Sequence, residues 1–163
     1  MLKTVVSIFV TFTTCGLLLG INGCSQKKPK VDEGIVSAID GSDFGTSDEG
    51  KALGLKTIHF AYDTNLLSDE AKEILQHNAE ILKAHPSVKL QIEGYCDEQG
   101  GAQYNLALGE KRADSTKFYL QDRGIASERL TTISFGKERP LFSGETEEAY
   151  AKNRRANFAL TSK

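Results

Sequence analysis

The chain has 163 residues, of which 39% are hydrophobic and 26% are charged, and its formal net charge is −2 at neutral pH. This length allows one domain of roughly 100–150 residues together with additional segments. Because the charge is close to zero and no basic run is present, the sequence lacks the electrostatic footprint of a nucleic-acid-binding protein, and we expect no nucleic-acid partner.

Residues 1–23 have the features of a secretory signal peptide. Lys3 supplies a positive start, and residues 5–20 form the uncharged apolar run VVSIFVTFTTCGLLLG. No second hydrophobic run and no stop-transfer charges follow it. We therefore predict a signal peptide that is removed, rather than a membrane-spanning helix.

The segment INGC, residues 21–24, resembles the lipobox of bacterial lipoproteins. The resemblance implies that Cys24 is acylated and becomes the new N-terminus; the alternative is ordinary cleavage that leaves Cys24 free. Acyl chains contribute about 0.8 kcal/mol per buried methylene, so two or more chains anchor a protein stably. Ser25, where an Asp would retain a lipoprotein in the inner membrane, favours the outer membrane with the body in the periplasm.

Residues 24–55 are predicted to be the lipidated Cys24 followed by a flexible tether. Gly, Ser, Asp and Lys dominate this segment, and its apolar residues are too sparse to build a core. With Cys15 removed and Cys24 acylated, Cys96 is the remaining thiol, and no internal disulfide is expected in the mature chain.

Residues 56–163 show the alternation of a small mixed domain. Strands are expected at residues 56–62, 87–95, 129–136 and 154–161, with Ile58, Phe60 and Tyr62 on one face of the first. Helices are expected at residues 67–86 and 102–124, with a short one before the last strand. The order β-α-β-α-β-(α)-β predicts an α+β, two-layer fold with helices on one face of a small mixed sheet.

Both long helices carry apolar residues at three-to-four spacing. Ser68 is a good N-cap for the first helix, and Pro86 ends it. Gly124 suits the left-handed position after the second. The expected buried stripes are Ala71, Ile74, Leu75, Asn78 and Leu82 in the first helix, and Leu106, Gly109, Ala113, Thr116 and Leu120 in the second.

The stretch GYCDEQGGAQYNLALGEKRA, residues 94–113, contains the chemistry-bearing side chains. A nucleophilic cysteine needs a base and an electropositive setting, whereas Cys96 is followed by Asp97 and Glu98. The three histidines are scattered, and no phosphate-binding loop or G-x-S-x-G motif is present. We therefore expect no catalytic residue, no metal site and no cofactor, and we expect Cys96 to be a buried or half-buried thiol.

Asp97 and Arg112 form a more promising pair. Asp97 follows a strand and Arg112 lies on the next helix, so a strand–loop–helix connection can bring them close together. One anion and one bidentate cation are the minimal receptor for a zwitterionic amino acid, because Arg112 can bind a carboxylate while Asp97 accepts an ammonium group. The alternative is a plain salt bridge that supports the loop.

Residues 56–161 closely resemble the OmpA-like domain of the peptidoglycan-associated lipoproteins. The resemblance rests on FAYD (60–63), EGYCDEQG (93–100), YNLALGEKRA (104–113), FGKERP (135–140) and AYAKNRRA (149–156), which occur in the family's order behind a lipobox. It implies non-catalytic binding of the peptidoglycan stem peptide through its meso-diaminopimelate, and hence a chain that is not an enzyme.

The resemblance also implies which residues bind the stem. The family's ligand pair falls on Asp97 and Arg112. Each further position keeps an alternative: Asp63 as a strand-end cap, Asn105 as a local cap, Leu106 as core, and the terminal NRR motif as a solvated strand edge. The implied set is Asp97, Arg112, Tyr62, Asp63, Asn105 and Leu106, with support from Asn153, Arg154 and Arg155.

Three positions depart from the family pattern. Tyr95 replaces a histidine, Cys96 replaces a small residue, and Gln99 replaces an arginine. The missing arginine removes a cation near the stem carboxylates, so affinity or stem preference is expected to differ.

The resemblance implies an outer-membrane lipoprotein that ties the membrane to the wall and binds TolB, the β-propeller partner in the Tol-Pal system of envelope integrity and cell division. The alternative is an OmpA-like wall-anchoring lipoprotein unconnected to Tol, such as a secretion or motility accessory.

Overall fold

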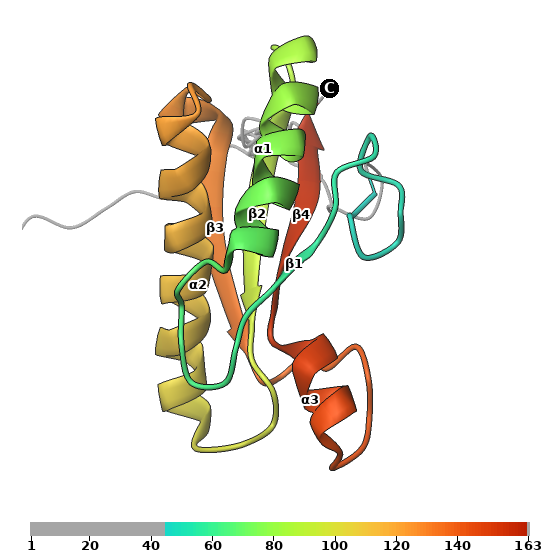
Figure 1. Ribbon diagram of the computed structural model, residues 1–163, viewed down its shortest axis with the longest axis vertical. Coiled ribbons are helices and arrows are strands. Elements are labelled where there is room, and N and C mark those ends of the chain that lie inside the picture. The colour runs from blue at the N-terminus through green and yellow to red at the C-terminus, as the bar shows by residue number, and fades with distance from the viewer. Residues whose placement is uncertain (1–44, 163) are drawn as a thin grey trace, which may run out of the picture. The chain divides into compact units, whose positions relative to one another are not determined.

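The computed structural model describes residues 45–162, which form a four-stranded sheet and its helices (Figure 1). The expected signal peptide, Cys24 and residues 24–44 of the expected tether lie outside the described residues. Among the described helices, none is both long enough and apolar enough to cross a membrane. In chain order the elements are β1 (Ile58–His59), α1 (Asp69–Ala84), β2 (Lys89–Tyr95), α2 (Ala102–Asp122), the 3-10 turn η2 (Ser127–Arg129), β3 (Leu130–Gly136), α3 (Glu147–Asn153) and β4 (Arg155–Ser162).

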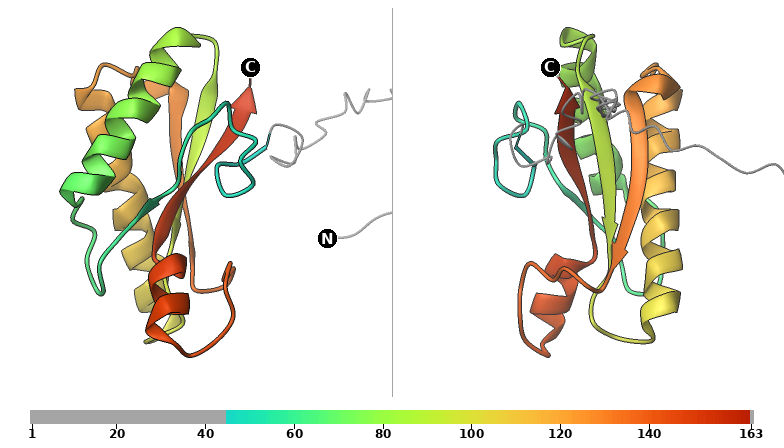
Figure 2. Two further views of the ribbon diagram at one scale, coloured as in Figure 1. Left: turned by 45° about the vertical axis from the view of Figure 1, so that its right-hand side comes forward. Right: turned by 180° about the vertical axis from the view of Figure 1, so that it is seen from behind.

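The strands form one mixed sheet in the order β1-β4-β2-β3. β2 and β3 are parallel, and β4 is antiparallel to both β1 and β2. A parallel pair needs a crossover connection, which α2 supplies. Helices α1 and α2 cover one face of the sheet, and their apolar side chains pack with Ile92, Phe158 and Leu160 in the core (Figures 1 and 2). The expected two-layer α+β fold is confirmed.

The position of β4 excludes one reading of the terminal NRR motif. β4 has a hydrogen-bonded strand on each side, so it is an interior strand rather than an edge. Asn153, Arg154 and Arg155 are at most 5% exposed. The alternative in which these residues form a solvated edge is therefore wrong.

α1 has the boundaries and the buried face that the sequence predicts. The side-chain oxygen of Ser68 accepts a hydrogen bond from the backbone N–H of Ala71 at 3.1 Å, which caps the helix. The helix ends at Ala84, two residues before Pro86. Its buried residues are Ala71, Leu75, Asn78, Ala79 and Leu82, with Ile74 partly buried.

α2 differs from expectation at its first turns. Leu106 was expected in the buried stripe, but its side chain is 51% exposed. Asn105 continues the three-to-four spacing instead, so a polar residue takes the inner position. Gly124 has the expected positive φ of 89° after the helix end. The buried residues of α2 are Asn105, Gly109, Arg112, Ala113, Thr116 and Leu120.

Two glycines allow α2 to lie directly against the sheet. A Cβ atom added at Gly94 of β2 would overlap the backbone carbonyl of Gly109, and one added at Gly109 would overlap the Ser134 hydroxyl of β3. This close approach places the N-terminal turns of α2 beside the carboxyl end of β2.

The first strand is shorter than the alternation of apolar residues suggests. Ile58 and Phe60 are buried as expected, but only Ile58 and His59 pair with β4. Tyr62, expected on the same face of the strand as these two residues, is 61% exposed. The chain leaves the sheet after Phe60, and residues 61–64 become a loop over α2.

Residues 45–55 belong to the folded domain, which corrects the expected tether boundary at residue 55. Ala52 is fully buried and Leu55 is 3% exposed, and both join the core. Thr46 forms a β-bridge with Ala159 of β4. The sparse apolar residues of this segment are thus sufficient, because they add to a core that the rest of the chain builds.

Candidate functional site

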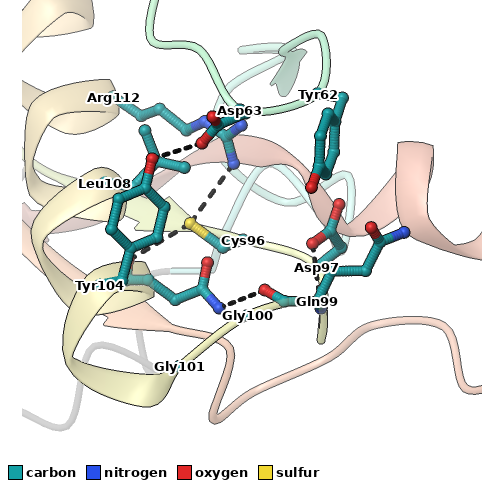
Figure 3. A pocket seen from close by; sticks show the side chains of 11 residues that line it. Tyr62, Asp63, Cys96, Asp97, Gln99, Gly100, Gly101, Tyr104, Leu108 and Arg112 are labelled. Carbon is teal, nitrogen blue, oxygen red and sulfur yellow. Dashed lines mark hydrogen bonds between the residues drawn. The ribbon is translucent and has the colours of Figure 1, made fainter.

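A cavity of about 250 Å³ lies where the loop after β1, the segment after β2 and the start of α2 meet. Figure 3 shows Tyr62 and Tyr104 on opposite sides of it, with Asp97 near the first and Arg112 behind Asp63. Backbone of Gly100 and Gly101 forms another wall, at the N-terminus of α2. The lining residues are Tyr62, Asp63, Cys96, Asp97, Gln99, Gly100, Gly101, Tyr104, Asn105, Leu108 and Arg112.

Asp97 is a buried carboxylate held in place by protein donors. Asp97 is 5% exposed. Oδ2 accepts a hydrogen bond from Arg154 Nη1 at 3.1 Å, and Oδ1 accepts one from the backbone N–H of Gln99 at 3.2 Å. The guanidinium of Arg154 also donates to Glu147 Oε1 at 2.6 Å and to the Phe60 carbonyl at 3.2 Å. Asp97 is therefore fixed at the cavity wall by an arginine that lies behind it.

Arg112 is 1% exposed and donates mainly to backbone carbonyls. Nε donates to Thr64 O at 2.9 Å, Nη2 to Ala61 O at 3.1 Å, and Nη1 to Tyr95 O at 3.0 Å. Nη1 also lies 3.4 Å from Cys96 Sγ. A guanidinium has five N–H donors, and these four contacts use four of them. One N–H therefore remains for a ligand. Burial lowers the pKa of Arg112 from its usual value, although the group stays charged.

These contacts correct the expected chemistry of the Asp97–Arg112 pair. Among the described residues, Asp97 forms its ion pair with Arg154 and not with Arg112, so the plain salt bridge between the two is wrong. Arg112 cannot act as a bidentate fork in this arrangement, because its donors already hold the loop after β1 and the end of β2. It can contribute its positive charge and a single N–H to the cavity.

The loop after β1 is joined to α2 across the cavity mouth. The Tyr104 hydroxyl donates a short hydrogen bond to Asp63 Oδ1, and this contact raises the pKa of Tyr104. Asp63 has a φ of 50°, a left-handed conformation that is uncommon outside glycine. Tyr104 is 57% exposed, like Tyr62 on the other side. The two rings can therefore face a ligand that enters from solvent.

Cys96 lines the cavity but is engaged in packing, as expected for a buried thiol. It is 3% exposed, and Sγ donates to the Asn105 carbonyl at 3.3 Å. Burial raises the pKa of the Cys96 thiol, which opposes a thiolate nucleophile. Within residues 45–162, no group of three or more His, Cys, Asp or Glu side chains could hold a metal ion.

The remaining predicted residues divide between the cavity and its support. Asn105 lines the cavity, and its Nδ2 donates to the Gln99 carbonyl at 2.7 Å, which ties the loop to α2. Leu106 does not line it, because its side chain lies outside the inner face of α2; Leu108 does. The prediction that Leu106 contacts the ligand is not supported by this geometry, and neither is its alternative as a core residue.

Within the NRR motif, Arg154 contacts the cavity wall, and its two neighbours bond to other parts of the domain. Asn153 Oδ1 accepts hydrogen bonds from the backbone N–H groups of Leu141 and Phe142 at 2.8 and 3.0 Å. Arg154 holds Asp97. Arg155 forms an ion pair with Asp48 at 2.8 Å on the other side of the sheet. None of the three lines the cavity.

The comparisons with known proteins agree with this fold. The model described as the OmpA family matches residues 59–154, which is more than half of the chain. The chain belongs to the OmpA family. It is 42% identical over 103 residues to the peptidoglycan-associated lipoprotein of Pasteurella multocida, covering 63% of this chain and 69% of the relative. The match to that of Brucella melitensis is 34% identical over 140 residues, covering 85% and 83%. The expected family relationship is confirmed.

Two solved structures show the same fold. The crystal structure of the peptidoglycan-associated lipoprotein from Burkholderia pseudomallei is 36% identical, with a TM-score of 0.62, and covers 64% of this chain and 89% of that one. The C-terminal domain of Helicobacter pylori MotB has a TM-score of 0.63 at 19% identity, covering 68% and 87%, which shows a shared fold alone.

Sequence reasoning missed several lining residues of this OmpA-family domain. Tyr104 directly precedes Asn105 in the YN motif, and an aromatic residue in the first exposed turn of α2 was the available signal. Gln99 was noted only as a departure from the family pattern. Leu108 carries no signal that separates it from an ordinary helix surface residue.

Proposed function

We propose that this OmpA-family chain binds the peptide stem of peptidoglycan, without catalysis, in the cavity between Tyr62 and Tyr104. The observation that carries the proposal is a buried carboxylate, Asp97, and a buried guanidinium, Arg112, on one cavity of about 250 Å³ with exposed aromatic walls. Relatives that share 34–43% of their residues with this chain are named peptidoglycan-associated lipoproteins.

The side chain of meso-diaminopimelate ends in an ammonium and a carboxylate group, which match this pair. Each Asp97 oxygen accepts one hydrogen bond from the protein, and an ionised carboxylate has about four acceptor positions, so Asp97 can also accept an ammonium donor. Arg112 offers its charge and one N–H to the carboxylate. Tyr62, Asp63 and Asn105 shape the opening, and Asn153, Arg154 and Arg155 hold the frame.

The binding step is tested by titrating soluble residues 25–163 with a stem peptide containing meso-diaminopimelate, and then with its lysine counterpart. Lysine lacks the terminal carboxylate, so it should bind more weakly. Asp97→Asn should cost on the order of 2–5 kcal/mol of binding free energy, as expected when one partner of a charged contact is lost.

Glu98→Gln, which changes the exposed neighbouring acid, is the matched control. Equal affinity for both peptides, or no loss with Asp97→Asn, contradicts the proposal, and turnover of wall fragments contradicts its non-catalytic part.

The second part of the proposal is a lipid anchor at Cys24 that attaches the protein to the outer membrane. It is supported by the INGC segment after an apolar N-terminal run, and by the names of the relatives. A diacylated chain bound to the wall would tie the outer membrane to peptidoglycan. Mass spectrometry of the mature N-terminus tests this part, and a free, unmodified cysteine there would refute it.

The third part is a role in the Tol-Pal system, with a TolB-like β-propeller as protein partner. It is supported by the FGKERP and AYAKNRRA segments, which resemble the corresponding family motifs. Co-purification from native membranes after cross-linking tests it. Recovery of wall fragments without any Tol component would favour a wall-anchoring lipoprotein of another system.

A further inference from the structure

A second hollow lies on the face of the sheet opposite α1 and α2. It has a volume of about 370 Å³. Figure 2 shows the segment that begins at residue 45 passing beside β4 on this side of the molecule. The site proposed for the wall peptide uses none of its residues. The lining residues are Thr46, Asp48, Glu49, Gln91, Glu93, Tyr95, Phe135, Arg139, Leu141, Asn157 and Ala159.

Glu93 places a buried carboxylate in this hollow. The residue is 9% exposed, and Oε2 accepts hydrogen bonds from the Tyr95 hydroxyl at 2.7 Å and from Asn157 Nδ2 at 2.8 Å. In the part of the chain that the structure describes, no cation lies within 4.0 Å of this carboxylate, and Oε1 accepts no hydrogen bond. Burying a charge without a cationic partner is costly, so this oxygen is a favourable position for an incoming cation.

The residues around Glu93 are hydrogen-bonded to one another, and the buried Arg155 already has a partner. Asn157 Oδ1 accepts hydrogen bonds from Ser47 Oγ at 2.6 Å and from the Asp48 N–H at 3.0 Å, so its Nδ2 is directed to Glu93. Arg155 donates to Asp48 Oδ2 at 2.8 Å. Asp48 thus pairs with Arg155, and Glu93 has no ion pair within 4.0 Å among the described residues.

One wall of the hollow is a pair of aromatic rings that already hold guanidinium groups of this chain, and its rim is apolar. Tyr95 and Phe135 stack with ring centroids 5.3 Å apart. Both rings already accept guanidinium groups of this chain, since Arg155 lies 3.8 Å from the Tyr95 centroid and Arg139 lies 4.0 Å from that of Phe135. Leu141, 50% exposed at the rim, can pack against methylene groups.

We propose that this hollow is a second binding site, which takes the guanidinium or ammonium group of an arginine or lysine side chain from a partner protein. Glu93 Oε1 accepts the charged group, and Leu141 contacts the stem. A protein side chain, rather than a free amine, fits the arrangement because Leu141, an exposed apolar side chain that lines the hollow, extends the contact beyond the charge. The site is separate from the proposed wall site and does not depend on it.

The test uses the whole chain in detergent micelles with ¹³C-labelled tyrosine rings. The five tyrosines report different places, and the Tyr95 signal is assigned by its loss in Tyr95→Phe. The probes are Nα-acetyl methylamides of arginine, lysine and norleucine, with methylammonium as the free amine. Arginine and lysine probes should shift the Tyr95 signal saturably, whereas norleucine, which lacks the charge, should not.

Variants then assign the shift to Glu93. Glu93→Gln keeps an acceptor for Tyr95 and Asn157 but removes the charge, and it should weaken the arginine probe at least fivefold. Asp97→Asn, in the other cavity, and Glu138→Gln, an exposed acid outside the hollow, should leave the Tyr95 titration within twofold. Should Glu93→Gln not fold, the norleucine comparison in the unchanged chain decides the question. Any of four results would overturn the proposal. Two concern the Tyr95 signal, which would either not move or respond equally to norleucine. The other two are an unchanged affinity in Glu93→Gln and methylammonium binding as tight as that of the side-chain probes.

Discussion

Arg112 organises the candidate wall site through carbonyl groups that come from separate segments. Its guanidinium bonds the loop after β1 through Ala61 and Thr64, and the end of β2 through Tyr95, while its charge lies 5.1 Å from the centroid of Phe60. A buried cation is stable only when its donors are satisfied, and three carbonyls serve that purpose here. The same side chain therefore builds the cavity and gives it positive charge.

Replacing Arg112 by lysine should destabilise the domain. An ammonium group cannot reach three carbonyls in the planar fan that a guanidinium spans, so at least one buried carbonyl loses its donor. We expect the free energy of unfolding to fall by about 2–4 kcal/mol, measured by urea denaturation. Arg139→Lys, at an exposed position, should change it by less than about 0.5 kcal/mol. Similar values for the two variants would contradict the role assigned to Arg112.

Tyr95 should make the domain sensitive to alkali. Burial and the Glu93 carboxylate raise the pKa of Tyr95 above its usual value, which is about 10 in an unfolded chain. Above that pH the unfolded state releases the proton while the folded state keeps it, so the stability from this group is complete below pH 10 and is lost as the pH rises further. In urea denaturation, Tyr95→Phe should be less stable at pH 7 but lose less stability above pH 10. The exposed Tyr62→Phe should follow the unchanged chain, and parallel pH curves for all three would refute this account.

Single residues also show what sequence could and could not provide about the site. Asp97 and Arg112 were predicted because they lie in one continuous stretch with a recognisable pattern. The partner of Asp97 is Arg154, 57 positions away, and no local spacing pairs two such residues. The occupied donors of Arg112 were equally hidden, because they depend on carbonyls whose positions follow from the fold.

At the scale of elements, α2 lies so close to β2 that the contact requires glycine on both sides. Gly94→Ala places a methyl group into the carbonyl of Gly109, which is backbone and cannot rotate away. Overpacking of this kind costs about 1–3 kcal/mol and moves the helix. We expect thermal unfolding at a lower temperature and weaker stem-peptide binding together, because the start of α2 lines the cavity. An unchanged melting temperature in Gly94→Ala would contradict the close approach.

Element prediction succeeded where one physical signal dominated. The helices α1 and α2 follow from three-to-four spacing and from the end signals at Ser68, Pro86 and Gly124. The alternation at Ile58, Phe60 and Tyr62 overestimated β1, because Arg112 draws the following carbonyls toward α2 and away from the sheet. Leu106 was assigned to the buried face because it is more hydrophobic than its neighbour Asn105. The Asn105 amide can be buried because it donates a hydrogen bond to the folded loop before α2.

At the scale of the whole domain, the segment before β1 covers part of the face of the sheet that the helices leave open. Ser47 and Asp48 bond Asn157, and Asp48 pairs with Arg155, so two residues of β4 depend on a segment more than 100 positions earlier. Composition alone suggested a tether here, since neither buried Ala52 nor buried Leu55 lies in a periodic pattern. The folded unit therefore begins before the first regular strand.

A chain that begins at residue 56 should accordingly be much less stable than one that begins at residue 45. The shorter chain leaves Arg155 buried without its carboxylate, and removal of one partner from a buried ion pair typically costs about 3–5 kcal/mol. It also exposes the core surface that Ala52 and Leu55 cover. Urea denaturation of both chains measures the difference, and Asp48→Asn in the longer chain separates the charge from the apolar contribution. We expect the truncation to cost more than Asp48→Asn alone, and equal midpoints for the two chains would show that the segment only rests on the sheet.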